Sequence, residues 1–505
     1  WGGPPGMQHK RMTPTRAPFA WRFRWGGPPG MQHKRMVEAG RRISVDNCLP
    51  IGHAGHMTDT VGSVRTPRPS DNHYLGGNYA PVEQELTAFD LPVTGEIPAD
   101  LEGRWLRNGP NPGGDIDPAV HHWFLGAGMV HGVRLRGGKA EWYRNRYVAG
   151  DDGFSPNTNV GGFAGTTWAM VEAGSPPVEL GYELDSHGAN RFFDTLPNGF
   201  SAHPKYDPAT GELHAMAYQW PDLVDHVQHI VVGPDGRVST VTDIPVPDMP
   251  MIHDMSLTAS YAVVYDLPVT VDLDVVVAGF PWPFTWAPDR AARVGLLPRS
   301  GTADDIVWCD VDPCYVFHPL NAYDADDGTV VVDLCRYDRM MASDRNGPFG
   351  DCMPTFDRWV IDPAARRVHE TRLDDRPQEF PRHHPGVGTR RHRYGYTSEV
   401  LDTGPNLHGA IIKIDVEAGT TEAHEFGGAR GGAEPIVVPK VDGVAEDDAW
   451  ILTVVYDPAT DASELHILDA QDITGPEVAR IELPQRVPYG FHGNWVPDTS
   501  VAPPT

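Results

Sequence analysis

The sequence predicts an all-β protein built as a β-propeller. Short runs of alternating or β-branched residues are separated by tight-turn signals, as in 133–136 before Gly137-Gly138 and in 230–232 before 233–236. The 54 glycines and 49 prolines disfavour long helices. The pentapeptide Tyr-Asp-Pro-Ala-Thr occurs at 206–210 and again at 456–460. This weak internal repeat is typical of diverged propeller blades, although two stacked β-sandwiches remain an alternative on pattern alone.

The first part of the chain has a different composition. The twelve residues WGGPPGMQHKRM occur at 1–12 and again at 25–36, and residues 1–36 hold seven Lys or Arg and no Asp or Glu. No apolar stretch follows, so the segment does not predict a secretory signal. A basic, Gly- and Pro-rich segment buries too little apolar surface to fold. We therefore expect a disordered tail over residues 1–70 and a single propeller domain over 71–505.

Composition excludes several classes of protein. The formal net charge of −27 argues against a nucleic-acid partner, because phosphate binding needs a basic surface. The five cysteines form no CxxC pair, which favours free thiols in a reducing cytosol over a disulfide framework. No run of about 18 apolar residues is present, so we expect no transmembrane helix. These observations together predict a cytoplasmic location.

Four of the 23 histidines stand apart from the others. His203, His253, His318 and His492 each follow a small or apolar residue and precede Pro, Asp or Gly, which is typical of a strand end. They are separated by 50, 65 and 174 residues, close to one, one and three propeller blades of about 50 residues. The innermost strands of a propeller surround one axis, so these imidazoles could converge there. Four neutral imidazoles would suit Fe, Cu, Ni or Zn, whereas the alternative is four packed core histidines.

The chain resembles the carotenoid cleavage oxygenase family over residues 76–498, and its bacterial members most. Several motifs carry this resemblance in the family's order. They are Gly77-Asn78-Tyr79-Ala80-Pro81, Arg107-Asn108-Gly109-Pro110-Asn111-Pro112, His122-Trp123-Phe124, Ser201-Ala202-His203-Pro204, Phe317-His318-Pro319-Leu320 and Tyr489-Gly490-Phe491-His492-Gly493. The resemblance implies a seven-bladed propeller whose loops and short helices form a cap over a non-haem iron centre.

The resemblance also implies roles for individual residues. His203, His253, His318 and His492 would bind one Fe(2+) per chain, with O2 as co-substrate. Behind three of these imidazoles the family places glutamates, which match Glu172, Glu379 and Glu434 here. Such a carboxylate fixes the tautomer of a ligating imidazole and raises its basicity. Thr158 matches a family position that gates the open iron site, and its alternative is an ordinary turn residue.

The implied reaction is oxidative cleavage of one conjugated C=C bond of a carotenoid or apocarotenoid to two carbonyl products. Two rival reactions belong to the same fold: cleavage of stilbenes and a retinoid-type isomerisation. A non-catalytic propeller that serves as a binding module is the alternative from another class. Val171 precedes Glu172 where the stilbene-cleaving branch carries a phenolate-binding Lys, which favours an apolar polyene.

An apolar polyene must reach the enzyme from a membrane or micelle. Residues 275–286 read VVVAGFPWPFTW, which is too short to span a bilayer. We expect Phe280, Trp282, Phe284 and Trp286 to form an exposed patch at the substrate entrance that contacts the membrane peripherally, with Arg290 and Arg293 near lipid headgroups. The alternative is a buried packing segment. The sequence predicts no oligomeric state.

Overall fold

The computed structural model describes residues 72–114, 116–150, 155–218, 223–401 and 406–499. The chain divides into two units, Trp1–Arg68 and Pro69–Thr505, and all described residues lie in the second. The tail predicted over residues 1–70 lies outside the described residues. The single domain predicted over 71–505 stays a prediction.

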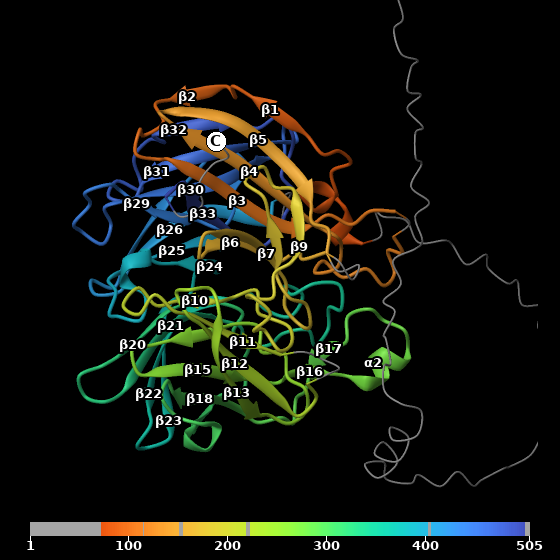
Figure 1. Cartoon of the computed structure of the whole chain (residues 1–505), viewed down its shortest axis with the longest axis vertical. Helices are drawn as coiled ribbons and strands as arrows, with labels where there is room; N and C mark the ends of the chain where they lie inside the picture. The colour runs from red at the N-terminus through yellow and green to blue at the C-terminus, as the bar shows by residue number, and fades with distance from the viewer. Residues whose placement is uncertain (1–71, 115, 151–154, 219–222, 402–405, 500–505) are drawn as a thin grey trace, which may run out of the picture. The chain divides into compact units, whose positions relative to one another are not determined.

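Three sheets each consist of four consecutive antiparallel strands (Figure 1). The predicted hairpins account for this pattern. In one of them β12 ends at Val232, the turn passes through Gly236 with a φ of +77°, and the chain returns as β13. A left-handed φ of this kind is readily adopted by glycine, which lacks a Cβ. The strands are β6 (Asn159–Phe163), β7 (Thr166–Met170), β8 (Val178–Leu180), β9 (Ser186–Ala189), β10 (Lys205–Tyr206), β11 (Leu213–Ala217), β12 (His226–Val232), β13 (Val238–Pro245), β24 (Gln378–Arg382), β25 (Tyr394–Val400), β26 (His408–Asp415) and β27 (Thr420–His424).

One sheet has eight strands and is made of two antiparallel halves. The halves join where β19 and β23 run parallel, at the single register pair Asp310 and Arg367. A separate two-stranded sheet is formed by β16 (Val269–Val271) and β17 (Phe284–Trp286), which come between two strands of the large sheet in the sequence. In order across the large sheet the strands are β14 (Met255–Leu257), β15 (Tyr261–Asp266), β18 (Ala292–Pro298), β19 (Val307–Val311), β23 (Arg367–Asp374), β22 (Thr355–Asp362), β21 (Val330–Arg336) and β20 (Pro319–Asp324).

Two sheets combine strands from early and late parts of the sequence. β33 pairs with β3, and β32 pairs with β2, so the ring of sheets is closed at two places. In Figure 1 the orange early strands accordingly lie beside the blue late strands. The strands are β1 (Thr87–Phe89), β5 (Lys139–Tyr147), β4 (Gly128–Arg136), β3 (Gly103–Pro110) and β33 (Gly493–Pro497) in one sheet, and β2 (Val93–Gly95), β32 (Ala479–Glu482), β31 (Ala462–Asp469), β30 (Ala449–Asp457), β28 (Gly431–Gly432) and β29 (Ile436–Pro439) in the other.

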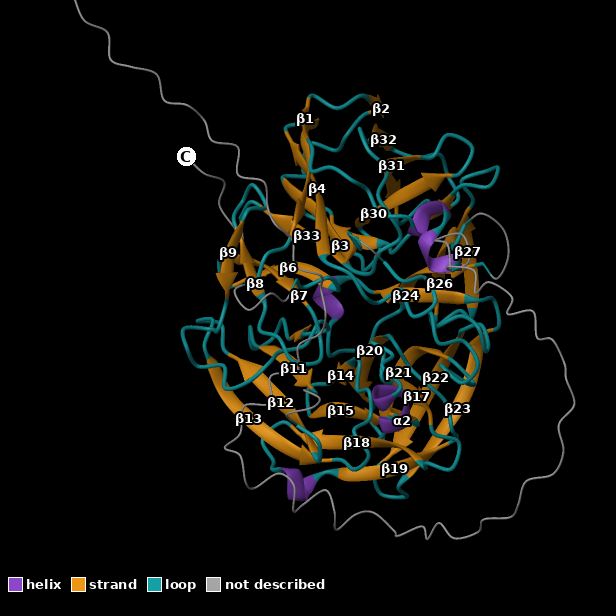
Figure 2. Ribbon diagram, turned by 90° about the vertical axis from the view of Figure 1, so that its right-hand side faces the viewer, coloured by secondary structure: helices purple, strands orange, loops and turns teal. Residues whose placement is uncertain are grey.

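These sheets form a β-propeller-like arrangement, so the predicted all-β class is confirmed. In Figure 2 the later strands β13, β18, β19 and β23 lie at the rim, while β11, β14, β20 and β24 lie nearer the middle. Among the described residues helical structure is limited to short segments: α2 (Leu273–Val277), η2 (His73–Leu75), η3 (Gly77–Tyr79), η4 (Ala303–Asp305) and η5 (Pro385–Val387). The count of seven blades depends on dividing the eight-stranded sheet in two and stays a prediction, as does the cap.

The hydrophobic core lies between neighbouring sheets. At the ring closure Leu106 on β3, Val130 on β4 and Val496 on β33 pack with Val160 on β6 of the next sheet, all at most 1% exposed. The approach of β33 to β3 requires Gly493, because a Cβ there would lie 2.2 Å from the carbonyl oxygen of Leu106. This contact fixes the strand that directly follows His492.

We predict that Leu106→Ala lowers the free energy of unfolding by about 3 kcal/mol, because it leaves a cavity between two sheets. Urea unfolding followed by tryptophan fluorescence would measure the loss. Val444→Ala is the control, because Val444 is 95% exposed and its truncation should change stability by less than about 0.5 kcal/mol. Equal losses in the two variants would contradict the packing described for the ring closure.

Candidate metal centre

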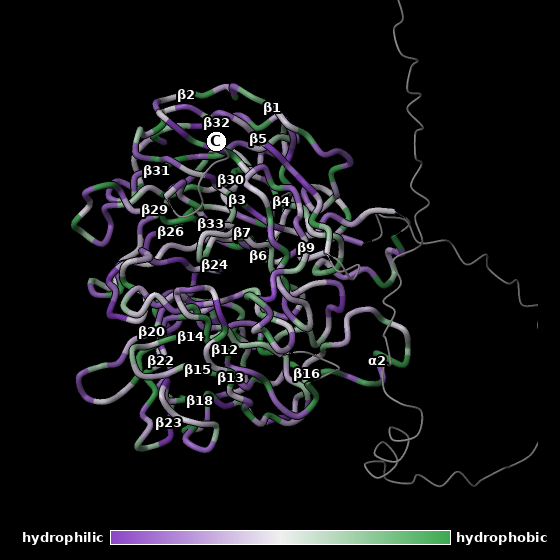
Figure 3. The backbone as a smooth tube through the Cα atoms, viewed as in Figure 1, coloured by the Kyte–Doolittle hydropathy of each residue, from purple (hydrophilic) through white to green (hydrophobic). Residues whose placement is uncertain are grey.

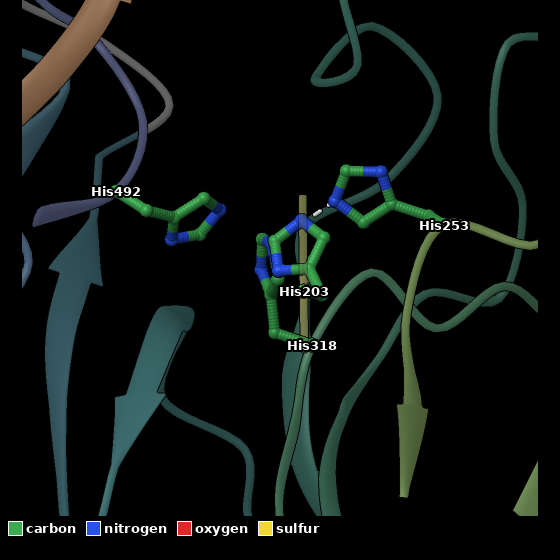
Figure 4. A group of neighbouring side chains, drawn as sticks. All are labelled: His203, His253, His318 and His492. Carbon is green, nitrogen blue, oxygen red and sulfur yellow. Dashed lines mark hydrogen bonds between the residues drawn. The ribbon is translucent and has the colours of Figure 1, made fainter. Parts of the chain in front are cut away.

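Four histidines from three sheets meet at one point, because the strands that follow His253 and His318 are the two edges of the eight-stranded sheet. His203 lies two residues before β10, His253 two residues before β14, and His318 and His492 directly precede β20 and β33. Each of these strands is the edge strand of its sheet. One ligand nitrogen from each imidazole lies within 4.8 Å of the others, and Figure 4 shows the rings turned toward one another. The four histidines therefore converge as predicted.

Burial keeps three of these imidazoles, His203, His318 and His492, neutral. His203, His253, His318 and His492 are between 5% and 9% exposed. Loss of solvation lowers the pKa of His203 and His318 well below the usual value, and it lowers the pKa of His492 to about 4. A metal ion binds imidazole through a nitrogen lone pair, so neutral rings are the form that can act as ligands.

Three glutamates fix the tautomers of three rings. The Nδ1 atoms of His253 and His492 lie 2.8 Å from Glu172 and Glu434, and the Nδ1 of His318 lies 2.6 Å from Glu379. A carboxylate oxygen accepts a hydrogen bond, so each Nδ1 carries the proton and each Nε2 keeps its lone pair. The structure thus brings the three predicted glutamates to the positions expected for them.

The free nitrogens fit a divalent metal ion. Nε2 of His253 and Nε2 of His318 are 3.2 Å apart, a separation that two metal–nitrogen bonds of about 2.1 Å span (dashed line in Figure 4). Nε2 of His203 is buried and has no hydrogen-bond partner. Lone pairs that face each other without a proton repel, and a cation between them removes that repulsion. Within the described ranges no other group of three or more potential ligands comes this close together.

The three carboxylates have different surroundings. Tyr218 donates a hydrogen bond of 2.8 Å to Glu172. Glu379 accepts from the Phe380 backbone at 2.6 Å, and burial raises its pKa to about 8. Burial also acts to raise the pKa of Glu434, but Arg382, 3.1 Å away, and the other donors outweigh it and bring that pKa to about 2. A dication among the histidines would stabilise the anionic form of all three glutamates.

Thr158 lies beside the centre but its side chain is engaged elsewhere. It is 6% exposed, and its carbonyl oxygen accepts a hydrogen bond of 3.0 Å from the backbone of His492. Its hydroxyl donates to Asn157 at 3.1 Å. The contact with His492 places Thr158 next to one ligand, while its gating role stays a prediction.

Aromatic rings surround the histidines. The ring of Phe317 lies 4.9 Å from that of His253, and the ring of Phe380 lies 5.5 Å from those of both His318 and His492. Phe124 continues this shell, 5.9 Å from Phe317 and 5.2 Å from Phe491. The surroundings of the centre are therefore apolar, apart from the carboxylates behind the ligands.

The aromatic segment predicted as an exposed patch is largely turned inward. Phe284 is 5% exposed, so the surface position expected for it is wrong. Trp282 is half-buried and stacks on His122 with a centroid distance of 4.4 Å. Phe280 and Trp286 are also half-buried. Burial of these rings against the core removes more apolar surface from water than exposure would.

The exposed apolar side chains of this region lie on α2 instead. Leu273 is 53% exposed and Val277 is 87% exposed. Both guanidinium groups of Arg290 and Arg293 contact the buried carboxylate of Asp266, at 2.5 and 2.7 Å, and their expected position near lipid headgroups stays a prediction. The role of the four aromatic residues at a membrane or entrance stays a prediction.

Sequence reasoning missed the groups that hold the glutamates. Tyr218 and Arg382 contact Glu172 and Glu434 respectively. Arg382 lies three residues after Glu379 on β24, but alternation along a strand does not indicate which neighbouring sheet a side chain reaches. The ion pair of Lys205 with Asp254 was missed as well, although Lys205 is two residues after one ligand and Asp254 directly follows another.

Comparisons with known proteins agree with this geometry. A family profile described as "Retinal pigment epithelial membrane protein" matches residues 79–497. A carotenoid cleavage oxygenase of Mycobacterium tuberculosis is 41% identical over 496 residues, which cover 85% of this chain and 98% of the relative. An apocarotenoid-15,15'-oxygenase of Synechocystis is 30% identical and is covered over 99% of its length, with 86% of this chain.

Solved structures show the same similarity. A variant of Synechocystis apocarotenoid oxygenase superposes with a TM-score of 0.75 and 28% identity, covering 86% of this chain and all of the other. A lignostilbene dioxygenase of Pseudomonas brassicacearum gives a TM-score of 0.77 and 26% identity over the same shares. The profile match spans well over half of the chain, and the four-histidine centre lies within it. This chain therefore belongs to the retinal pigment epithelial membrane protein family, the family of the carotenoid cleavage oxygenases, and is an enzyme of that kind.

Proposed function

We propose that this protein is a non-haem iron(II) dioxygenase that cleaves one conjugated C=C bond of a carotenoid or apocarotenoid. The observation that carries the proposal is the group of four buried imidazoles, three of which have Nδ1 bonded to a glutamate and Nε2 free. Four imidazole ligands, with no carboxylate bound directly to the metal, suit a borderline metal such as iron(II). Curated relatives of this chain are named carotenoid cleavage oxygenase and apocarotenoid-15,15'-oxygenase.

Iron(II), held by His203, His253, His318 and His492, would supply the activation of dioxygen. The chain's own groups create the conditions for that chemistry. Glu172, Glu379 and Glu434 keep the proton on Nδ1 of their partners, so the ligands stay oriented while the reaction proceeds. The phenyl rings around the centre exclude water and align an apolar substrate. Thr158 would restrict access to the remaining side of the metal.

Cleavage with both oxygen atoms gives two carbonyl products, aldehydes or ketones, from one polyene. A polyene is electron-rich and apolar, which matches the aromatic shell formed by Phe124, Phe317, Phe380 and Phe491. Val171 is half-buried beside Glu172 and has no group that could bind a phenolate. This supports a polyene over a 4-hydroxystilbene, the substrate class suggested by the lignostilbene dioxygenase neighbour.

The same proposal includes the seven-bladed framework. The halves of the eight-stranded sheet are joined by one register pair, so each half can serve as a four-stranded blade. With the other five sheets of four or more strands this division gives seven blades. The four ligand-bearing edge strands β10, β14, β20 and β33 would then be the innermost strands of four blades.

We further propose a peripheral membrane contact at α2. No helix in the described part of the chain is long and apolar enough to cross a membrane. The α2 segment projects from the sheets in Figure 1, and the green of this segment in Figure 3 marks hydrophobic residues. Leu273 and Val277 are exposed there, and the half-buried rings of Phe280, Trp282 and Trp286 follow directly in sequence. An apolar substrate could pass from lipid to the aromatic shell by this route.

The first prediction of this proposal concerns iron content. Freshly purified protein supplied with Fe(II) under anaerobic conditions should bind about one iron per chain. His318→Ala should retain less than about a tenth of it, because one ligand and the partner of Glu379 are removed. The control is His131→Asn, since His131 is buried but bonded to Tyr143 at 2.8 Å, away from the ligand set. A folded wild-type protein that takes up no iron would overturn the proposal.

The second prediction concerns oxygen. Turnover of a carotenoid or apocarotenoid should consume about one dioxygen for each polyene cleaved. With oxygen-18 gas and rapid quenching, mass spectrometry should find label in both carbonyl products. Cleavage of 4-hydroxystilbenes without cleavage of polyenes would identify the stilbene reaction instead. Conversion of a retinoid in the absence of oxygen would identify an isomerase.

The third prediction concerns lipid binding. Each apolar side chain that enters lipid contributes about 1.5 kcal/mol or more, so Leu273→Ser with Val277→Ser should weaken binding to liposomes at least tenfold. Flotation with phosphatidylcholine vesicles would measure it. Val441→Ser with Val444→Ser is the matched control, because those side chains are 66% and 95% exposed elsewhere. Equal binding by both double variants would contradict a membrane contact at α2.

A further inference from the structure

One ligand differs from the other three in how it is held. His253, His318 and His492 each contact a glutamate at 2.6–2.8 Å through Nδ1. For His203 the Nδ1 contact is with Asp254, at 3.8 Å, which is too long for a hydrogen bond. His203 is nevertheless close to a second ligand, because the centroids of its ring and that of His253 are 4.3 Å apart. Some other interaction must hold this pair of rings in place.

A buried ion pair connects the two turns that carry these rings. Asp254 directly follows His253 and is 3% exposed. Its Oδ2 accepts from Nζ of Lys205 at 2.8 Å, and its Oδ1 accepts from the backbone of Met255 at 2.6 Å. Lys205 begins β10, two residues after His203, and Met255 begins β14. The pair therefore links two neighbouring sheets at the position where each sheet presents a ligand.

We infer that the Asp254–Lys205 ion pair is a clamp that positions His203 relative to His253 and so completes the metal centre. The inference rests on the proposed iron site. Asp254 and Lys205 are positioning residues, since neither contacts the centre as a ligand. The clamp holds His203 in position through a link between two sheets, whereas a glutamate holds each of the other three rings directly.

The charge of the pair explains why Asp254 does not bind His203 directly. Lys205 draws the carboxylate to itself, and a charge-assisted hydrogen bond of 2.8 Å is stronger than a contact at 3.8 Å. Lys205 reaches solvent with a side chain that is 28% exposed, whereas the aspartate is enclosed. Removal of the ammonium group leaves a buried carboxylate without its partner, and removal of the carboxylate frees the Lys205 end of the link.

A double-mutant cycle tests the clamp. Lys205→Met and Asp254→Asn should each weaken Fe(II) binding about tenfold, measured anaerobically by competition with a chelator. The double variant should bind within about twofold of the weaker single variant, because one link is broken in all three. Electron paramagnetic resonance of the nitric oxide adduct should show the same altered ligand geometry in each.

Lys413→Met is the matched control. Nζ of Lys413 lies 2.8 Å from Asp447, the same separation, but this pair includes no neighbour of a ligand. The control should bind Fe(II) like the wild type. Single variants that bind within about twofold of the wild type, or a Lys205→Met variant that binds more tightly, would overturn the clamp.

Cobalt(II) separates the clamp from the proposed function. If the wild type takes up cobalt but not iron, the proposed function fails while the cobalt visible spectra of the same variants still test the clamp. Spectra of both single variants that match the wild type would then overturn it. A wild type that binds neither metal would overturn both inferences.

Discussion

Four imidazoles can share one cation only if each keeps its proton on the nitrogen that faces away from the cation. In this protein that condition is met for three of the rings by contacts on their outer side, at Glu172, Glu379 and Glu434. Burial makes the neutral form of His203, His318 and His492 the stable one, and it also makes any unpaired carboxylate costly. Arg382 and Tyr218 therefore support the arrangement, because they satisfy two of the carboxylates.

The ring of sheets brings these groups together. Each ligand precedes an edge strand, and the four strands belong to three sheets, so packing between sheets sets the positions of His203 and His492 relative to the other two ligands. Contacts that cross between sheets then have a direct effect on the centre. Arg382 on β24 reaches Glu434 and the backbone of Gly493, and Lys205 on β10 reaches Asp254 before β14.

Much of this site could be predicted from the sequence. Turn signals identified the antiparallel strands, and His203, His253, His318 and His492 stood out by their strand-end settings; the family resemblance then supplied the glutamates. The burial of Phe284 could not be predicted, because an aromatic segment has the same composition whether it faces lipid or packs in the core. Val277, which is exposed, belongs to the apolar stretch 275–286, and the exposed Leu273 lies just before it, but the sequence does not indicate which side chains of the stretch face solvent. Asp254 and Lys205 were equally hidden, since their pairing depends on which sheets are neighbours.

The order of the four histidines along the chain bears on when a metal ion could bind to all of them. His203 and His492 are separated by nearly 290 residues, and β33, which follows His492, pairs with the early strand β3. During translation the first three imidazoles leave the ribosome long before the fourth. A nascent chain therefore offers only an incomplete ligand set, and full coordination becomes available at the moment when the ring of sheets closes. Coordination of a metal ion by all four imidazoles would thus require the same late step that closes the ring of sheets.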